Sequence, residues 1–227
     1  MRRWKKIPSN MQNDAVYQCY LTLRKKWFSL FCKRAFDIVV SLLLLLLLSP
    51  LFLVLAIAVK IDSRGPVFYR QVRVTQYGKT FRIHKFRTMV ANADKLGGQV
   101  TVAGDSRVTR TGRFLRKCRL DEISQLIDVL AGKMTFVGTR PEVPAYVARY
   151  TDEMKATLLL PAGVTSEASI RYKDEAALLE NAVDADETYV KEVLPAKMVY
   201  NLQAVRAFGF WKDIGTMFKT VGAVLKR

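Results

Sequence analysis

Apolar and polar positions divide the chain into one continuous apolar run and a series of shorter patterned segments. The run extends from Leu42 to Val59 and reads LLLLLLLSPLFLVLAIAV. Eighteen helical residues would measure about 27 Å, close to the roughly 30 Å hydrocarbon core of a bilayer. Ser49 and Pro50 lie at its centre, and proline removes a backbone donor and clashes with the preceding helical turn. We therefore expect a membrane-embedded helix that is broken at this pair.

Both flanks of the run are basic. Loops retained in the cytoplasm carry an excess of Lys and Arg, so a spanning helix would leave one basic flank on the outer side. The flanking cations are Arg24, Lys25, Lys26, Lys33 and Arg34 before the run and Lys60, Arg64, Arg70, Arg73 and Lys79 after it. This symmetry favours a re-entrant anchor that returns to the cytoplasmic face. A kinked span stays open as the alternative, because proline also occurs within transmembrane helices.

Shorter patterns predict the elements that follow. The stretch GPVFYRQVRVTQYGKTFRIHKFRTM alternates apolar and polar residues around Gly78, which predicts two short strands joined by a turn. Residues 90–112 contain glycines without periodicity and predict loops. A helix that starts near Asp121 and stops at Gly132 is predicted by apolar residues at helical spacing, namely Leu120, Ile123, Leu126, Ile127 and Leu130. Residues 174–206 are also helical in pattern, with a break expected at Pro195.

The two ends of the chain are amphipathic. Residues 1–31 mix cations with aromatic side chains, which is typical of a helix at a membrane interface. A partly disordered basic tail is the alternative for the first dozen residues. Near the C-terminus, one helical face would carry Trp211, Ile214, Phe218, Val221 and Leu225. That helix would either lie on a membrane surface or close the core.

Together these patterns predict a helix-rich α/β fold with short strands in a monotopic membrane protein. A chain of 227 residues can bury one substantial core, and no long linker separates a second domain. The expected parts are a membrane-interface extension over residues 1–32, a re-entrant helix-break-helix anchor over 33–60 and a cytoplasmic domain over 61–227. The last part would carry any catalytic site and end in the interfacial amphipathic helix.

Composition narrows the chemistry. The chain has 37 Lys and Arg against 20 Asp and Glu, a formal charge of +17, which suits nucleic acid, anionic lipid or a phosphorylated substrate. Three widely spaced cysteines suit a reducing compartment and form no zinc pattern. The single histidine, His84, excludes a multi-histidine metal site, and we expect it to be structural or solvated because no partner is evident. Carboxylates are then the expected catalytic groups.

Asp121 and Glu122 are adjacent acids at the predicted helix start, directly after a cluster of cations. A helix N-terminus and nearby arginines would keep Asp121 ionised for attack at phosphorus, while Glu122 could hold Mg2+. Acids in a first helical turn are also ordinary capping residues, so the pair alone does not decide between these roles. The preceding cations Arg113, Arg116 and Lys117 share one side of a helical turn and would clamp a diphosphate or rest on anionic headgroups.

Four stretches, in their order, resemble the bacterial sugar transferases, the monotopic polyprenyl-phosphate phosphoglycosyl transferases. They are KRAFDIVVSLLLLLLLSPLF, GPVFYRQVRVTQYGKTFRIHKFRTM, DSRVTRTGRFLRKCRLDEISQLIDVLAGKMTFVGTRPE and PAGVTS, and they run from about Lys33 to at least Gly163. The resemblance implies a re-entrant helix broken at a Ser-Pro pair, which matches Ser49 and Pro50. It also implies a catalytic Asp-Glu dyad, which matches Asp121 and Glu122.

By this resemblance, Asp121 attacks the sugar-bearing phosphate of a UDP-sugar, releases UMP and holds the phosphosugar covalently, with Glu122 binding Mg2+. Polyprenyl phosphate then accepts the phosphosugar, which starts assembly of capsule, exopolysaccharide, O-antigen or glycoprotein glycans. The implied location is the bacterial inner membrane, among membrane lipids, with the domain and both termini on the cytoplasmic face. Phosphate and nucleotide contacts are implied for Lys85, Arg87, Arg110, Arg140, Pro141 and Glu142.

The chain also departs from the family pattern. Ile123 and Ser124 stand where Leu-Pro usually follows the dyad, and Ser106 replaces a frequent Pro. Thr139 precedes Arg140 where Pro is usual. The stretch GVTSEASIRYKDE replaces a common Gly-Leu-Ala-Gln-Val stretch, so the resemblance does not indicate the donor sugar.

Two other classes of function compete with the enzyme. The charge and the mixing of aromatic residues with cations also suit a membrane-tethered nucleic-acid-binding protein. No helix-turn-helix or RNA-binding signature is present, so we expect no nucleic-acid partner. A catalytically idle scaffold of a glycan-assembly complex is the second alternative, and the intact acid pair argues against it. A homodimer is possible, since one sequence leaves the oligomeric state open.

Overall fold

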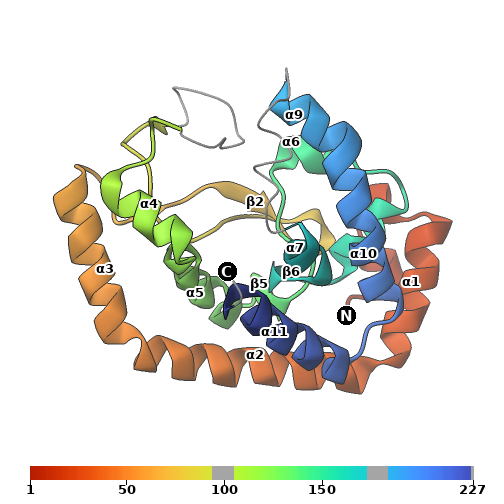
Figure 1. Cartoon of the computed structure of the whole chain (residues 1–227). Coiled ribbons are helices and arrows are strands. Elements are labelled where there is room, and N and C mark those ends of the chain that lie inside the picture. Colours follow the sequence, from red (N-terminus) through yellow and green to blue (C-terminus); the bar gives the residue numbers. More distant parts are fainter. Residues whose placement is uncertain (94–104, 173–183, 226–227) are drawn as a thin grey trace.

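The computed structural model describes residues 1–93, 105–172 and 184–225, and is rich in helix, with three two-stranded sheets among those residues (Figure 1). Helix α2 (Trp27–Leu47) runs along the base of the view, and α3 (Ser49–Asp62) rises from its end. The strands and the other helices lie on one side of α2 (Figure 1). The predicted helix-rich fold with short strands is confirmed.

The apolar run folds as two helices that meet at Leu48 with a bend of 63°. Pro50 lies in the first turn of α3, where its missing N–H costs no hydrogen bond. The hydroxyl of Ser49 donates to the carbonyl of Leu46 at 2.8 Å, so it satisfies an acceptor beside the break. The predicted break is confirmed. Among the described residues no single helix is long and apolar enough to cross a bilayer, whereas α2 and α3 together meet that criterion.

Helix α2 has one polar face that is buried against the domain. Lys33, Asp37 and Ser41 recur at i, i+4 and i+8 and are all buried, whereas Leu43 and Leu47 are exposed. Lys33 donates to the carbonyl of Val137 at 2.7 Å and pairs with Asp213 of α11 (Phe210–Leu225). Because such contacts recur along α2, with Phe36, Val40 and Leu44 packed against a core cluster, the helix lies against the domain.

The N-terminal segment packs into the domain. It forms two short 3₁₀ helices, Trp4–Lys6 and Ser9–Met11, followed by α1 (Asp14–Lys25). Ile7, Met11, Val16 and Leu23 are at most 3% exposed and belong to the largest core cluster. Burial of Ile7 and Met11 disfavours the alternative of a disordered tail. The segment predicted as a membrane-interface extension therefore contributes to this core, while Trp27 and Phe28 near its end are exposed.

The predicted hairpin is confirmed. Strands β2 (Val72–Val74) and β3 (Thr80–Arg82) pair antiparallel, and β1 (Phe68–Tyr69) and β4 (Lys85–Phe86) continue the same register further from the turn. Tyr77 and Gly78 close the turn with φ of 60° and 69°. This left-handed pair reverses the chain within three residues, as in tight hairpin turns that favour glycine.

The loops predicted over residues 90–112 end earlier than expected, because α4 (Arg110–Lys117) already includes Gly112. A Cβ at Gly112 would lie 2.0 Å from the carbonyl oxygen of Thr88, so glycine is required by this close approach and not by a turn. Gly97, Gly98 and Gly104 lie outside the described residues. After α4 come a 3₁₀ helix over Leu120–Gln125, which we call the dyad helix, and α5 (Leu126–Leu130).

The rest of the domain surrounds a short parallel sheet of β5 (Met134–Val137) and β6 (Ala162–Thr165). Between them lie α6 (Pro144–Val147) and the 3₁₀ helix Met154–Leu159, and after them α7 (Glu167–Arg171). Then α9 (Ala185–Thr188), a π-helical turn (Tyr189–Val193) and α10 (Leu194–Arg206) form one helical path. The break expected at Pro195 is therefore wrong: the π turn before it accommodates the proline. Residues 174–183 of that prediction lie outside the described residues.

Helix α11 closes the core, which is one of the two alternatives for the C-terminal end. It packs against α2, α7, β5 and β6, and Asp213 binds Lys33. Its opposite side leaves Trp211 79% and Phe218 75% exposed. The helix thus closes the domain, lies beside α2 (Figure 1) and leaves two aromatic side chains exposed.

Candidate functional site

The dyad helix places Asp121 and Glu122 between α4 and α5. Arg119, with φ of 57°, turns the chain sharply after α4, and the next residues form 3₁₀ turns up to Gln125 instead of the predicted α-helix. Phe86 and Leu115 are buried beneath this segment with Leu120 and Ile123. The fold therefore turns two polar residues inward on a segment that is anchored by its apolar neighbours.

Glu122 is held by two cations from distant parts of the chain. Its Oε1 accepts from Nζ of Lys85, on β4, at 2.9 Å and also from the guanidinium of Arg140, which follows β5. The second guanidinium nitrogen of Arg140 lies 3.3 Å from Oε2. Burial opposes the ionisation of Glu122, but Arg140 and Lys85 outweigh it and hold its pKa well below the usual range. Burial in turn lowers the pKa of Lys85, against the influence of Glu122.

Asp121 has a different environment although it is the next residue. Its side chain is 9% exposed, and burial raises its pKa, followed by the repulsion of Glu122. Lys85 and Arg116 oppose this rise. The sequence predicted that a helix N-terminus and arginines would favour the ionised form; Lys85 and Arg116 do so, while burial and Glu122 shift the pKa in the other direction. Desolvation outweighs the nearby cations because Glu122 already engages Lys85.

Arg87, expected to contact phosphate, is buried against the C-terminal end of α3. Its guanidinium donates to the carbonyl of Ser63 at 2.6 Å, to the hydroxyl of Ser63 at 2.9 Å and to the carbonyl of Pro66. Its Nε is buried without a hydrogen-bond partner among the described residues. These contacts give Arg87 a structural role at the C-terminal end of α3 and do not bring it to the dyad.

Of the remaining predicted contacts, Arg140 is the one whose side chain bonds to the dyad within the described part of the chain. Arg110 and Arg113 are exposed on α4. The carbonyl of Pro141 accepts from Arg73 at 3.0 Å. The carboxylate of Glu142 is buried and accepts from the hydroxyl of Tyr189 at 2.6 Å, so it belongs to a separate polar cluster.

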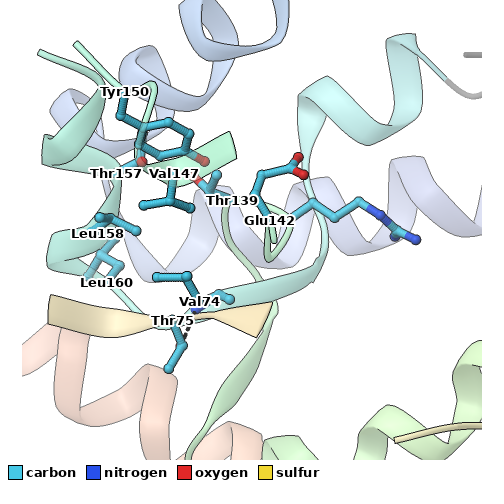
Figure 2. Close-up of a pocket in the computed structure, with 11 residues that line it drawn as sticks. Val74, Thr75, Thr139, Glu142, Val147, Tyr150, Thr157, Leu158 and Leu160 are labelled. Atoms are coloured by element: carbon cyan, nitrogen blue, oxygen red, sulfur yellow. Dashed lines mark hydrogen bonds between the residues drawn. The ribbon is translucent and has the colours of Figure 1, made fainter. Parts of the chain in front are cut away.

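That cluster borders a cavity of about 10 Å3, room for a single water. Figure 2 shows Val147, Leu158 and Leu160 on one side of it and Thr139 and Glu142 on the other. The cavity is far too small for a nucleotide. It therefore marks the packing behind Arg140 and not a substrate pocket.

Two further cations lie near the dyad: Arg116, which the sequence placed in a possible diphosphate clamp, and Arg73, for which no site role was predicted. Arg116 of α4 faces the charges of Asp121 and Glu122 while its Nε donates to the hydroxyl of Thr88 at 2.9 Å. Arg73 of β2 lies close to Lys85 and Arg140. Repulsion among these cations adds to the effect of burial in lowering the pKa of Lys85 and that of Arg73. Arg116 had a signal in the basic helical turn, whereas strand alternation around Arg73 gave no indication of a site.

His84 has a partner that the sequence did not reveal. Its backbone N–H donates to Oδ2 of Asp128 at 2.8 Å, and its ring Nδ1 lies 2.9 Å from Oδ1. Ser124, where the family pattern usually has Pro, donates its hydroxyl to the carbonyl of His84 at 3.0 Å. The structural role expected for His84 is confirmed, and the expectation of no partner is wrong.

No group of three or more His, Cys, Asp and Glu side chains within the described ranges is arranged to hold a metal ion. The dyad itself offers two carboxylates, and both oxygens of Glu122 already face Lys85 or Arg140. Mg2+ commonly binds one or two carboxylates together with substrate phosphates. The donor set therefore fits Mg2+ only in company with a phosphorylated substrate.

Comparison of the sequence with known proteins shows which family the chain belongs to. The bacterial sugar transferase family matches residues 28–227. The chain belongs to this family. The resemblance seen in the sequence motifs is thereby confirmed, and the match includes α2 from Phe28 onward, α3 and the dyad helix.

Relatives of this chain include undecaprenyl-phosphate sugar phosphotransferases. A UDP-N-acetylgalactosamine-undecaprenyl-phosphate N-acetylgalactosaminephosphotransferase of Aeromonas hydrophila is 34% identical over 198 residues, 86% of this chain and 44% of that protein. A UDP-glucose:undecaprenyl-phosphate glucose-1-phosphate transferase of Escherichia coli is 38% identical over 194 residues, 83% of this chain and 39% of that protein. The chain spans less than half the length of these two relatives. A glucose-1-phosphate transferase of Caulobacter vibrioides is 33% identical, with 69% of its length covered.

Proposed function

We propose that this sugar transferase moves a phosphosugar from a UDP-sugar to polyprenyl phosphate at the cytoplasmic face of the bacterial inner membrane. The observation that carries the proposal is the buried dyad, in which Glu122 is held by Lys85 and Arg140 while Asp121 has no such ion pair among the described residues. The names of the relatives, which act on UDP-sugars or transfer sugar phosphates to undecaprenyl phosphate, support the same substrates.

The proposed chemistry has two displacements at one phosphorus. A carboxylate oxygen of Asp121 attacks the phosphorus that bears the sugar, and the bond to the bridging oxygen breaks, so that UMP leaves with the electron pair. A phosphate oxygen of the polyprenyl phosphate then attacks the same phosphorus and releases the Asp121 carboxylate. A carboxylate with a raised pKa is the more basic and hence the stronger nucleophile of the dyad.

Cations around the dyad would stabilise charge on the transferring group. Lys85, Arg140 and Arg116 come from three separate elements and converge on Asp121 and Glu122. Positive groups that are fixed in advance stabilise developing negative charge at phosphorus without reorganisation. Arg110 and Arg113, exposed on α4, remain in the proposal as outer contacts for substrate phosphates.

We also propose that Mg2+ takes part, with Glu122 as its protein ligand beside oxygens of the donor diphosphate. When bound, the ion would neutralise diphosphate charge. Since Glu122 faces Lys85 and Arg140 in the present arrangement, these two cations would pass to the substrate phosphates as Glu122 turns to the metal. Excess EDTA should then abolish turnover, and full activity in EDTA would refute this role.

For the anchor, we propose a re-entrant course with both chain ends on the cytoplasmic side. The bend of 63°, the basic flanks and the attachment of α2 to the domain through Lys33 and Asp37 support it. Membrane lipids would contact the exposed leucines of α2 and α3. Impermeant thiol reagents should leave single cysteines near residues 5 and 222 unlabelled in intact cells and label them after lysis. External labelling at either end would contradict the re-entrant course.

The first test of the transfer reaction is UMP release by the purified protein in detergent with Mg2+, polyprenyl phosphate and a panel of UDP-sugars. Release with at least one donor, lost in Asp121→Asn, is the expected result and identifies the donor sugar. A folded protein that releases no UMP with any donor would contradict the proposal and favour the scaffold.

A further inference from the structure

We propose that His84 and Asp128 form a positioning pair that aligns Lys85 with the catalytic dyad. Lys85 follows His84 directly, and its Nζ lies 2.9 Å from Oε1 of Glu122. The pair would act on the transfer reaction through this lysine, so the inference rests on the proposed function. His84 itself is a positioning residue, since its contacts go to Asp128 and Ser124 and not to the dyad carboxylates.

The hairpin opens at His84. Strands β2–β3 and β1–β4 share one register, but the ladder is interrupted between Arg82 and Lys85. At the interruption the backbone N–H of His84 turns to Asp128 and its carbonyl accepts from Ser124. His84, the residue before Lys85, thus bonds to the segment that carries the dyad and not to the partner strand.

Asp128 is well suited to hold this exchange in place. It has no exposed surface, and its two carboxylate oxygens accept separately from the backbone N–H and the ring of His84, at 2.8 and 2.9 Å. A buried carboxylate that uses both oxygens on one residue fixes that residue's position and its ring orientation together. Asp128 lies on α5, seven positions after Asp121. Its bonds therefore connect His84 to the helix that directly follows the dyad helix.

Ser124 supplies the third attachment. Its hydroxyl lies 3.0 Å from the carbonyl oxygen of His84 and 3.4 Å from that of Asp121, and the residue is fully buried. His84 is therefore fixed through its N–H, its carbonyl and its ring. Because an error of about 1 Å in a reacting constellation can cost on the order of 100-fold in rate, such attachment matters for Lys85.

The structural arm of the test is hydrogen exchange of the whole protein in detergent. Asp128→Ala removes both acceptors, so amides of residues 83–86 and 120–125 should exchange about tenfold faster while those of α1 stay unchanged. Asp128→Asn is the conservative control. Its Oδ1 can accept from the N–H of His84, and its Nδ2 can donate to Nδ1 of a ring protonated at Nε2, so exchange should stay near wild type. Unchanged exchange in Asp128→Ala, or faster exchange across the whole chain, would overturn the inference.

The functional arm is UMP release by the same folded proteins. Asp128→Ala should lower kcat about tenfold or more with the donor KM changed less than about threefold, and Asp128→Asn should recover most of the loss. Asp37→Ala is the matched control, because it also removes a buried carboxylate bonded to one backbone N–H and one side chain. Its kcat should stay within about twofold of wild type. Equal losses in all three variants, or unchanged kcat in Asp128→Ala, would overturn the inference.

The two arms separate the possible failures. If the wild type releases no UMP with any donor, the proposed function is refuted, and hydrogen exchange still decides whether Asp128 holds residues 83–86. If the wild type is active and the Asp128 variants match it, the positioning role alone is refuted.

Discussion

Asp37 in α2 and Asp121 in the dyad are both buried carboxylates, yet they differ in their hydrogen-bond partners. Asp37 accepts from the hydroxyl of Thr135 at 2.7 Å and the N–H of Phe136 at 3.1 Å. Asp121 accepts no hydrogen bond from another side chain in the described part of the chain, and Lys85 and Arg116 influence it only through their charge. A carboxylate satisfied by the protein's own donors fastens two elements, whereas one left without them is available to a substrate.

The same contrast separates Asp121 from Glu122 within the dyad. The charges of Lys85 and Arg140 hold the pKa of Glu122 well below its usual value against the effect of burial, while burial raises the pKa of Asp121. Environments that push two neighbouring carboxyl pKa values apart commonly assign different roles to them. Here they separate the proposed nucleophile from the proposed metal ligand.

The largest expected effect comes from removing the free carboxylate. Asp121→Asn should lower UMP release by at least about 1,000-fold, because the amide is a poor nucleophile and cannot form the phosphosugar adduct. Steady-state UMP release measures it. An active Asp121→Asn enzyme would contradict the role of Asp121 as nucleophile and leave it no functional difference from Asp37.

Glu122→Gln should lower UMP release by about 100-fold, since it removes the partner of Lys85 and Arg140 and the proposed Mg2+ ligand. It should also lower the midpoint of thermal unfolding at pH 7. The lowered folded pKa means that ionised Glu122 adds stability above its unfolded pKa of about 4.3, and this is lost as pH falls through the folded pKa. A midpoint that does not differ from wild type at pH 7 would contradict the ion-pair argument.

Asp37→Ala should destabilise the fold by about 2–3 kcal/mol, because it leaves two buried donors without an acceptor. Turnover per folded molecule should stay within about twofold of wild type. Denaturant unfolding and UMP release of the same preparation measure the two quantities. A large loss of turnover in fully folded protein would show that Asp37 contributes to the reaction and not only to the attachment of α2.

Asp121→Asn should have the opposite effect on stability to Glu122→Gln. Since burial raises the folded pKa of Asp121, its ionised form costs stability at neutral pH, and the amide should raise the unfolding midpoint by about 2–4 °C. The gain should disappear as pH falls through the folded pKa toward the unfolded value of about 3.9. A lower midpoint at pH 7 would show that the carboxylate is better satisfied than this structure indicates.

The smallest effects are expected on the exposed face of α4. Arg110→Gln or Arg113→Gln should raise the donor KM by less than about fivefold, and the effect should shrink with added salt, because solvent-exposed charges are screened. Donor titrations at two ionic strengths measure this. A 100-fold loss at either position would move that arginine into the buried site.

Local patterns were sufficient to predict several elements. The break at Ser49 and Pro50 follows from the missing donor of proline, and the hairpin around Gly78 follows from alternation and the left-handed turn residues. Predictions failed where a distant contact changed a local preference. Gly112 was assigned to a loop because its contact with Thr88 is tertiary, and Pro195 was assigned to a break because the π turn before it has no sequence signal.

The acid pair was predictable and its electrostatics were not. Asp121 and Glu122 are neighbours in the sequence, and Arg140, Pro141 and Glu142 are consecutive, so motif resemblance was enough to select them. Which cation meets which carboxylate depends on the approach of β4, α4 and the end of β5 to the dyad helix. Arg87 reaches the anchor and Arg116 faces the dyad for this reason.

The sequence by itself determined the family, the broken apolar helix, the hairpin and the identity of the dyad, because each depends on residues close together in the chain. Only the tertiary structure decided that Asp121 has a raised pKa, that Lys85 and Arg140 hold Glu122, and that Asp128 binds His84. Burial and charge depend on distances between segments far apart in the sequence. The residues of each segment set which chemical groups are present, and the packing of the segments sets which of these groups come into contact.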